Sequence, residues 1–431
     1  MKVLIITYYW PPAGGPGVQR VLKFAKYLPE FGWEPVILTV ENGEFPAIDE
    51  SLMNDIPEGI KVYKTKTLEP FNLYKKLLKQ DKNDKIGTFV LAEKQTSLLG
   101  KFSNWLRRNL FIPDARMGWI SYATKKGIQI VKEENIDAIF SSSPPHSLQI
   151  AAMKIAKKTR VKWISDFRDP WSEIVFNQEA TISTISKVVN QYFEHKVMNS
   201  CDGLITVSPS IGRTIKSKLK HNKDIAIIPN GYDFTIKPIT NTADIFTITY
   251  TGVMSDTRIP WKLFSVLGEL KHEGYKFKLK LVGNISTQIT KLIVDNNIHD
   301  MCVIEGYKTH SAVIEDLSSS DALLLVIDNV PDNLGILTGK LFEYIGMQKP
   351  ILAIGNIKGD AYDIIEKCNC GKLYDYNDSD GMKTFIKQIY RAKQNKEPIF
   401  DFTSTECYSR KNLAQELAKY LSQITNNENN K

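Results

Sequence analysis

Short apolar runs alternate with amphipathic stretches along the chain. Val3–Thr7 is a continuous apolar run, which is typical of a buried parallel strand, and Val18–Leu28 carries apolar residues at helical spacing. Glu34–Val40 is a second apolar run. A strand, a Gly-rich turn, a helix and a strand therefore follow one another, and this βαβ unit predicts a doubly wound α/β sheet.

The alternation continues through the first half of the chain and restarts after a polar linker at 237–244. The first series predicts strands at 138–140, 162–165, 203–207 and 225–228, with helices at 147–158 and 185–198. The second series predicts strands at 245–251, 277–282, 302–304, 322–327 and 350–354, with helices at 261–272, 311–318, 340–347 and 408–424.

Two α/β series in tandem predict two Rossmann-like domains, an N-terminal one over 1–236 and a C-terminal one over 237–404. Paired domains of this kind are expected to face each other across a cleft. A ligand would bind there, at the carboxyl ends of the strands.

Composition agrees with a globular chain of two domains. The 431 residues are 42% hydrophobic and 24% charged, and no apolar run reaches the roughly 18 residues that span a bilayer. The first residues predict a β-strand and no signal peptide, because no small-residue cleavage site follows them. Five cysteines, an odd number, fit a reducing cytoplasm, so we expect a cytoplasmic protein.

One window carries the whole net charge of +8: between residues 71 and 130, 12 Lys and Arg stand against four acids. Within this window, residues 98–111 would form, if placed on a helix, an apolar aromatic face beside Arg107 and Arg108. Such a helix suits an anionic membrane surface, and the alternative is a helix packed on its own domain with solvated charges. No nucleic-acid-binding module is recognisable, so no nucleic-acid partner is expected.

The Gly-rich turn Gly14–Gly17 lies between the first strand and its helix. Glycines such as Gly15 let backbone N–H groups approach an anion at the helix start, and Arg20 favours an anionic ligand there. A plain tight turn is the alternative. As a dinucleotide fingerprint the segment is poor, because Arg20 stands where a third Gly belongs.

Two further loops of the first half follow strands. Pro144 and Pro145 fix the backbone before His146, which is expected to project from a rigid loop at the sheet edge. Asp166 and Arg168 close the next strand and are candidates for binding a polar ligand, with Asp166 the better one. The alternative is an internal Asp–Arg pair that braces the loop.

In the second half, Thr338-Gly339 is expected to begin a helix whose free N–H groups suit a diphosphate, with the charge of Lys340 beside them. Glu343 lies on the same helix face and can accept hydrogen bonds from ribose hydroxyls, unless it pairs with Lys340. Asp378–Asp380 reads as a loop, and no metal-binding triad is apparent. Two more candidates follow the first strand of this half: Gly252 lies at its end, and Arg258 lies six residues later.

These segments together resemble the retaining family-4 glycosyltransferases of the GT-B fold over nearly the whole chain. The loop FRDPW resembles a bacterial subgroup involved in surface-polysaccharide assembly. The motifs that carry the resemblance are Tyr8–Arg20 (YYWPPAGGPGVQR), Ser141–Ser147 (SSSPPHS), Ser165–Trp171 (SDFRDPW), Ile227–Asp233 (IIPNGYD), Tyr250–Gly252 (YTG) and Thr338–Leu352 (TGKLFEYIGMQKPIL).

The resemblance implies a metal-independent transfer of a hexosyl or N-acetylhexosaminyl group from a UDP- or GDP-linked donor to a glycan or polyprenyl-linked acceptor, with retention and without a cofactor. The N-terminal domain would hold the acceptor, and a helix at 405–425 would cross back onto it. The protein would act in the cytoplasm or at the inner face of the membrane. By position, Gly15 and His146 would lie at the reacting sugar, Arg258 and Lys340 would neutralise the diphosphate, Glu343 would hold the ribose and Tyr307 would lie at the base.

The chain departs from the family pattern at one place. The family usually has two Glu residues separated by seven positions, and the position eight before Glu343 is Gly335. A relative that binds carbohydrate or lipid without catalysis is therefore one alternative. A nicotinamide-dependent oxidoreductase built on the first Gly-rich turn is the other.

Overall fold

The computed structural model describes residues 1–45, 47–68, 109, 111–172, 182–234 and 245–426. It divides into two compact units, which are described separately here. Unit 1 comprises Met1–Pro229 together with Arg410–Lys431, and unit 2 comprises Asn230–Ser409. The boundary at Pro229 lies slightly before the expected one at 236, and the last helix belongs to unit 1.

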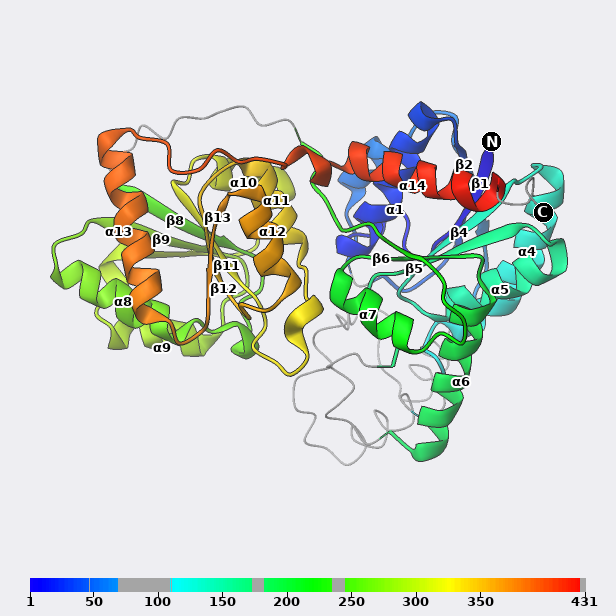
Figure 1. Ribbon diagram of the computed structural model, residues 1–431, viewed down its shortest axis with the longest axis horizontal. Helices are drawn as coiled ribbons and strands as arrows, with labels where there is room; N and C mark the ends of the chain where they lie inside the picture. The colour runs from blue at the N-terminus through cyan, green and yellow to red at the C-terminus, as the bar shows by residue number, and fades with distance from the viewer. Residues whose placement is uncertain (46, 69–108, 110, 173–181, 235–244, 427–431) are drawn as a thin grey trace. The chain divides into compact units, whose positions relative to one another are not determined.

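Unit 1 contains a seven-stranded parallel sheet with the order β3-β2-β1-β4-β5-β6-β7 (Figure 1). The chain reverses its direction of winding between β1 and β4, and this switch point is where α/β sheets bind ligands. The strands are β1 (Lys2–Ile6), β2 (Glu34–Val40), β3 (Lys61–Thr65), β4 (Ala138–Ser143), β5 (Lys162–Phe167), β6 (Gly203–Thr206) and β7 (Ile225–Ile227).

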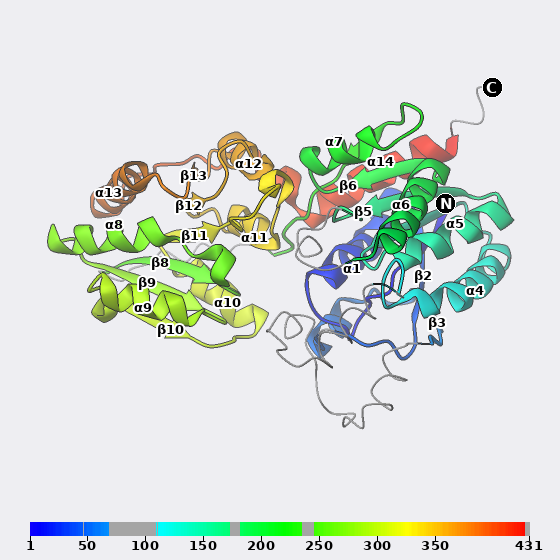
Figure 2. The same ribbon diagram turned by 90° about the horizontal axis from the view of Figure 1, so that it is seen from below.

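Helices cover both faces of this sheet. One core lies under α4, α5, α6 and α7, with α4 and α5 side by side (Figure 2), and a second core lies under α1 and α14. The last helix is fixed to this unit by polar contacts as well, since Tyr420 Oη accepts a hydrogen bond from the Leu204 amide at 3.1 Å. The helices are α1 (Pro16–Tyr27), α4 (Ile120–Glu133), α5 (Ser147–Thr159), α6 (Thr184–Ser200), α7 (Pro209–Ser217) and α14 (Arg410–Asn426).

Unit 2 contains a six-stranded parallel sheet with the order β10-β9-β8-β11-β12-β13. Its switch point lies between β8 and β11, so the loops after these two strands are where a ligand is expected. The strands are β8 (Phe246–Thr251), β9 (Phe277–Val282), β10 (Cys302–Glu305), β11 (Ala322–Val326), β12 (Ile351–Ile354) and β13 (Gly371–Tyr374).

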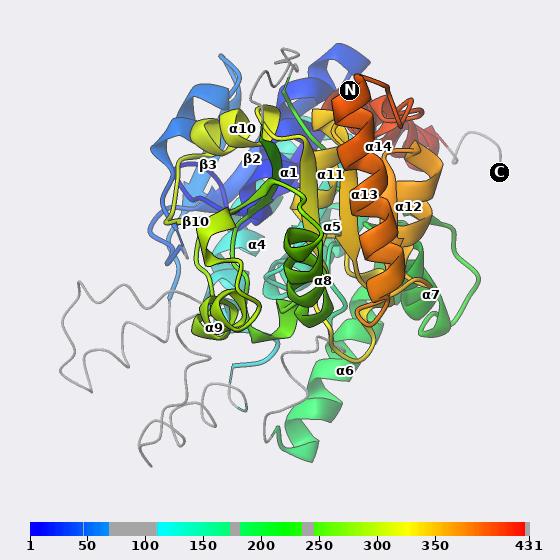
Figure 3. The ribbon, with the colours of Figure 1, turned by 90° about the vertical axis from the view of Figure 1, so that its left-hand side faces the viewer.

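The sheet of unit 2 is again covered on both faces. Helices α8, α9 and α13 bury one core, with α8 and α13 side by side (Figure 3), and α10, α11 and α12 bury the other. The helices are α8 (Trp261–His272), α9 (Thr287–Asp295), α10 (His310–Ser318), α11 (Gly339–Met347), α12 (Asp360–Cys368) and α13 (Ser379–Asn395).

The two doubly wound units confirm the predicted α/β architecture. The expectation of a loop at Asp378–Asp380 is wrong, because Asp378 accepts a hydrogen bond from the Gly381 amide at 2.9 Å and so caps α13. The basic amphipathic helix predicted at 98–111 lies, except for residues 109 and 111, outside the described residues. No helix in the described part of the chain is long and apolar enough to cross a membrane.

Candidate functional site

The start of α11 is the centre of the candidate site in unit 2. Thr338 is the residue before the helix, and Gly339 and Lys340 form its first turn. Burial of the apolar side of α11 fixes this helix on the sheet, and Tyr344 Oη accepts a hydrogen bond from the Thr251 amide at 3.2 Å. The hydroxyl of Thr338 is buried and has no hydrogen-bond partner in the described structure. The first turn of α11 therefore lies next to the end of β8.

The ammonium group of Lys340 is held against β8. Its Nζ donates a hydrogen bond to Tyr250 Oη at 2.8 Å and lies 4.2 Å from the centre of the Tyr250 ring. Burial, followed by the charge of Arg258, lowers the pKa of Lys340 to about 7, although the carboxylates of Glu343 and Asp328 oppose this shift. The site thus holds a cation whose charge is poorly compensated, which favours the arrival of an anion.

Arg258 is fixed by a carboxylate that the sequence analysis missed. Its Nε and Nη2 donate to the same oxygen of Asp328, at 2.8 and 2.6 Å. A third hydrogen bond, from Thr257 Oγ1 to Asp328 Oδ1 at 2.7 Å, orients this carboxylate. The position of Asp328 just after the apolar strand β11 was the only signal in the sequence. Asp328 therefore sets where the Arg258 guanidinium lies beside Lys340.

Glu343 lies one turn after Lys340 and faces His310 rather than the lysine. His310 Nε2 lies 3.4 Å from Glu343 Oε1, and no ion pair joins Glu343 to Lys340 within the described residues. The carboxylate is partly exposed and can accept hydrogen bonds from a ligand. Tyr307, the residue expected at the base, is 93% exposed.

Gly252 makes room for the Lys340 ammonium. Its φ is +100°, and a Cβ at this position would lie 2.6 Å from Lys340 Cε and 2.8 Å from Nζ. We expect Gly252→Ala to displace the amine and to weaken binding of UDP about 10-fold, the effect of losing about 1.4 kcal/mol. Isothermal titration calorimetry measures the effect.

Gly274→Ala is the matched control, because Gly274 has a φ of +90° and no atom within 4 Å of the added Cβ. It carries the same kind of backbone cost without a contact to Lys340. Equal UDP affinities for the two variants would contradict the role given to Gly252.

In unit 1, the Gly-rich turn ends at an open helix start. Gly15 precedes α1 with a φ of +97°, and a Cβ there would meet no atom within 4 Å. Glycine is favoured at this backbone conformation, and the space above it is free. The turn is anchored nearby by the hydrogen bond from the Gly14 amide to the Ala47 carbonyl at 2.8 Å.

Asp166 forms a buried ion pair that the sequence analysis did not anticipate. Its two oxygens accept from Nε and Nη2 of Arg20, both at 2.9 Å, and both side chains are 0% exposed. Ser142 Oγ donates to the same carboxylate at 2.6 Å. The expectation that Arg20 binds an anionic ligand is wrong in this structure, because its guanidinium is buried in the ion pair with Asp166. Contact between Asp166 and an acceptor stays a prediction.

Arg168 braces two neighbouring segments, the end of β4 and the start of α1, through their carbonyl groups. Its guanidinium donates to the carbonyl oxygens of Ser143, Gly17 and Pro144, each at 2.9 Å. The bracing role that the sequence left open for Arg168 is thus present, but its partners are carbonyls rather than an aspartate. The contact to Gly17 also ties the strand-end loop to the Gly-rich turn.

His146 lies buried just before α5 with its ring stacked on an aromatic partner. The ring centre is 4.6 Å from that of Trp171, with an interplanar angle of 13°, and neither ring nitrogen has a hydrogen-bond partner in the described structure. Burial, followed by the charge of Arg168, lowers the pKa of His146 to about 3. The imidazole is therefore neutral at physiological pH, with one donor and one acceptor that have no partner among the described residues. The expectation that His146 projects from its loop is wrong, because the side chain is buried.

The described residues contain no group of three or more His, Cys, Asp or Glu side chains that could hold a metal ion. The charged groups near α11 are instead two cations and two carboxylates, Lys340 with Arg258 and Glu343 with Asp328. Metal independence stays a prediction.

Comparisons with solved structures identify the fold. A glycosyltransferase from Rickettsia africae superimposes with a TM-score of 0.65 at 16% identity, over 99% of both chains. The lipopolysaccharide outer core galactosyltransferase WaaB gives a TM-score of 0.58 at 13% identity, over 97% of this chain and 99% of that one. The chain has the GT-B fold. HepE of Anabaena, solved in complex with UDP-glucose, shares the fold with a TM-score of 0.55 at 12% identity, over 99% and 98% of the two chains.

The sequence itself matches a known family over part of its length. Residues 92–235 match the model of Glycosyltransferase Family 4. No curated protein matches the chain. The matched segment lies almost entirely in unit 1 of the GT-B chain and includes His146, Asp166 and Arg168, whereas the cations around α11 lie outside it.

Proposed function

We propose that this GT-B chain is a metal-independent, retaining glycosyltransferase that acts in bacterial surface-polysaccharide assembly. The donor is a UDP- or GDP-linked hexose or N-acetylhexosamine, and the acceptor is a glycan or a polyprenyl-linked glycan. The observation that carries the proposal is the desolvated ammonium of Lys340, which lies beside Arg258 at the first turn of α11. The family-4 match and the glycosyltransferases among the structural neighbours support it.

Departure of a nucleoside diphosphate requires stabilisation of negative charge on the leaving oxygen. Lys340, Arg258 and the N–H groups at Thr338-Gly339 supply fixed positive charge and dipoles for this purpose, so a divalent cation is not needed. The bond between the anomeric carbon and the diphosphate oxygen breaks as the acceptor hydroxyl bonds to that carbon from the same face. The hydroxyl proton passes to the departing phosphate oxygen, and the anomeric configuration is retained.

The other candidate residues bind rather than transfer protons. Glu343 accepts hydrogen bonds from the ribose, and Tyr307 lies at the base. Gly15 offers backbone N–H groups near the sugar. His146, neutral because of its burial, donates to one sugar hydroxyl and accepts from another. Asp166 and Arg168 maintain the shape of the acceptor loops.

The affinity for UDP is expected to fall as the pH rises above about 7. The pKa of Lys340 in the free protein is about 7, and a bound diphosphate raises it, so binding at higher pH requires uptake of a proton. The association constant should decrease about 10-fold per pH unit above pH 8, the limit for uptake of one proton. Calorimetry in two buffers of different ionisation enthalpy measures both effects.

Lys340→Arg provides the control for this pH dependence. A guanidinium stays protonated throughout this range, so the variant should bind UDP with little change between pH 7 and 9. A wild-type affinity that does not change between pH 7 and 9 would contradict binding of the diphosphate by a Lys340 whose pKa is lowered in the free protein.

The proposed function is tested by a donor screen over UDP- and GDP-sugars, run in parallel with and without chelator. Release of nucleoside diphosphate, followed by NMR assignment of the anomeric configuration of the product, supports the proposal. Release that stops in the presence of chelator overturns metal independence. Absence of release with every donor, together with saccharide binding, favours the non-catalytic relative, and tight binding of NADH favours the oxidoreductase.

Membrane contact through 98–111 stays a proposal from the sequence alone. The apolar face and the two arginines there suit an anionic leaflet, where a polyprenyl-linked acceptor is located. Cytoplasmic location, peripheral at the inner face of the membrane, forms part of the same proposal.

A further inference from the structure

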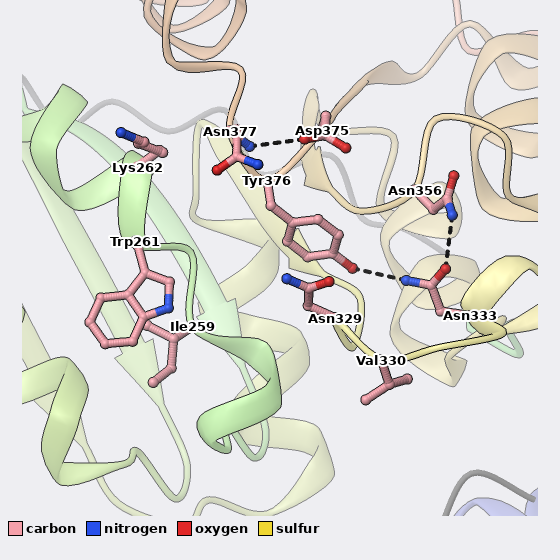
Figure 4. A pocket seen from close by; sticks show the side chains of 10 residues that line it. All are labelled: Ile259, Trp261, Lys262, Asn329, Val330, Asn333, Asn356, Asp375, Tyr376 and Asn377. Carbon is pink, nitrogen blue, oxygen red and sulfur yellow. Dashed lines mark hydrogen bonds between the residues drawn. The ribbon is translucent and has the colours of Figure 1, made fainter.

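A pocket of about 460 Å³ opens at the strand ends of unit 2, beside the Arg258–Asp328 pair (Figure 4). Its walls come from the loops that follow β8, β11, β12 and β13. Ile259 follows Arg258 and Asn329 follows Asp328, so the pocket adjoins the cation site without including Lys340. Its volume lies in the range of small-molecule sites.

Two aromatic rings line this pocket. Trp261 begins α8 and is 52% exposed, while the Tyr376 ring lies across the space from it (Figure 4). The Tyr376 hydroxyl donates toward the carbonyls of Ile327 and Asp328, which fixes the ring. A large apolar ring that remains half exposed at the mouth of a polar pocket is a surface on which a flat ligand face can stack.

Amide side chains supply half of the remaining lining. Within the described residues, the amides of Asn329 and Asn377 have no side-chain hydrogen bond to protein. Asn356 Nδ2 donates to Asn333 Oδ1 at 3.0 Å, and Asn333 Nδ2 donates to the Asp328 carbonyl at 3.0 Å, so these two amides are pre-oriented. Amides can donate to and accept from hydroxyl groups at the same time.

The charge of the pocket is balanced. Its lining contains one cation, Lys262, and one anion, Asp375. A polyanion such as a diphosphate therefore gains little here, in contrast to the site at Lys340. Aromatic faces, paired donors and acceptors and little net charge together match an uncharged ligand that has many hydroxyl groups and an apolar C–H face.

We propose that this pocket is a binding site for a neutral saccharide, whose ring stacks on Trp261 and whose hydroxyls bind Asn329 and Asn377. The saccharide is a unit of a free glycan, distinct from the sugar of the nucleotide donor. The inference goes beyond the proposed function and does not depend on Lys340.

Saturation-transfer NMR on the full-length protein tests the site with two sets of probes. N,N′-diacetylchitobiose, maltotriose and cellotriose represent a free glycan, whereas UDP-glucose and UDP-N-acetylglucosamine represent a donor, with UDP and uridine beside them. At least one of the free glycans should receive saturation in its ring protons. Its affinity should fall about 5-fold or more in Trp261→Ala and less in Trp261→Phe, because loss of stacking removes about 1 kcal/mol. Asn329→Ala should weaken the same ligand.

Tyr192→Ala is the matched control, because Tyr192 is an exposed aromatic residue of unit 1, 56% exposed, and should leave saccharide binding unchanged. If no free glycan depends on Trp261, or if only the nucleotide sugars or uridine depend on it, the inference is overturned. UDP binding that requires Lys340 keeps the proposed function in that case. Conversely, saccharide binding that requires Trp261 without any UDP binding keeps this site and rejects the proposed diphosphate site.

Discussion

Lys340→Ala is expected to lower the rate of nucleoside diphosphate release from the donor about 100- to 1,000-fold, the range found when one fixed stabiliser of a developing oxyanion is removed. The reason is local. The Lys340 Nζ is positioned by Tyr250 at 2.8 Å and is poorly solvated, so its attraction for an oxyanion is only weakly screened by water. Steady-state kinetics with the best donor of the screen measures the change.

Two control variants make the result specific. Lys291→Ala removes an exposed lysine of α9 and should leave the rate unchanged. Arg258→Ala should also slow release, and it leaves Asp328 without its partner, so its effect combines lost attraction with an added negative charge. Equal rates for wild type and Lys340→Ala would remove the proposed function.

Burial of Lys340 is expected to destabilise the folded protein when no ligand is bound. The pKa of Lys340 is lowered in the folded state, so the unfolded chain binds more protons between pH 7 and the usual lysine range, and stability rises with pH there. A buried, poorly compensated charge of this kind is typical of functional sites, where affinity for a ligand is obtained at the expense of the stability of the ligand-free protein.

The elements that were predicted best from the sequence are those with a clear local spacing of apolar residues. Glu34–Val40, Trp261–His272 and Phe277–Val282 have in the structure the bounds that their apolar periodicity indicates. Helix α13 was missed as a whole: Asp378 and its polar neighbours resemble a turn, whereas in the structure they begin a helix that continues to Asn395. Local propensity alone does not distinguish these two uses of Asp and Asn.

Candidate site residues were predictable only where one segment contains the whole feature. Thr338, Gly339 and Lys340 are consecutive, so their position at a helix start followed from spacing. The carboxylate that fixes Arg258 lies 70 residues away, at Asp328, and a single sequence offers no sign of that pairing. The folded sheet brings them together because the loops after β8 and β11 are neighbours at the switch point.

The second large effect concerns the buried pair in unit 1. Both Arg20→Ala and Asp166→Ala are expected to lower the free energy of unfolding of unit 1 by about 3–5 kcal/mol, because each leaves an uncompensated charge in the core. The two side chains are 0% exposed and are joined by two hydrogen bonds of 2.9 Å. Urea unfolding followed by tryptophan fluorescence reports on unit 1 in a Trp261→Phe background, because Trp261 is the one tryptophan in the sequence of unit 2.

The double variant Arg20→Leu/Asp166→Leu tests whether the loss of stability comes from a buried charge left without its partner. Removal of both charges together should destabilise the unit less than the two single changes added, since neither charge is then left alone. Glu30→Ala, which breaks the exposed pair with Lys411, should change stability by at most about 1 kcal/mol.

The variant Asp166→Asn distinguishes a bracing role from an acceptor-binding role. If Asp166→Asn keeps full stability but raises KM for the acceptor, Asp166 binds substrate as the sequence suggested. If stability falls while KM is unchanged, the carboxylate acts by holding Arg20 and Ser142, and through them the loops of the switch point, in place.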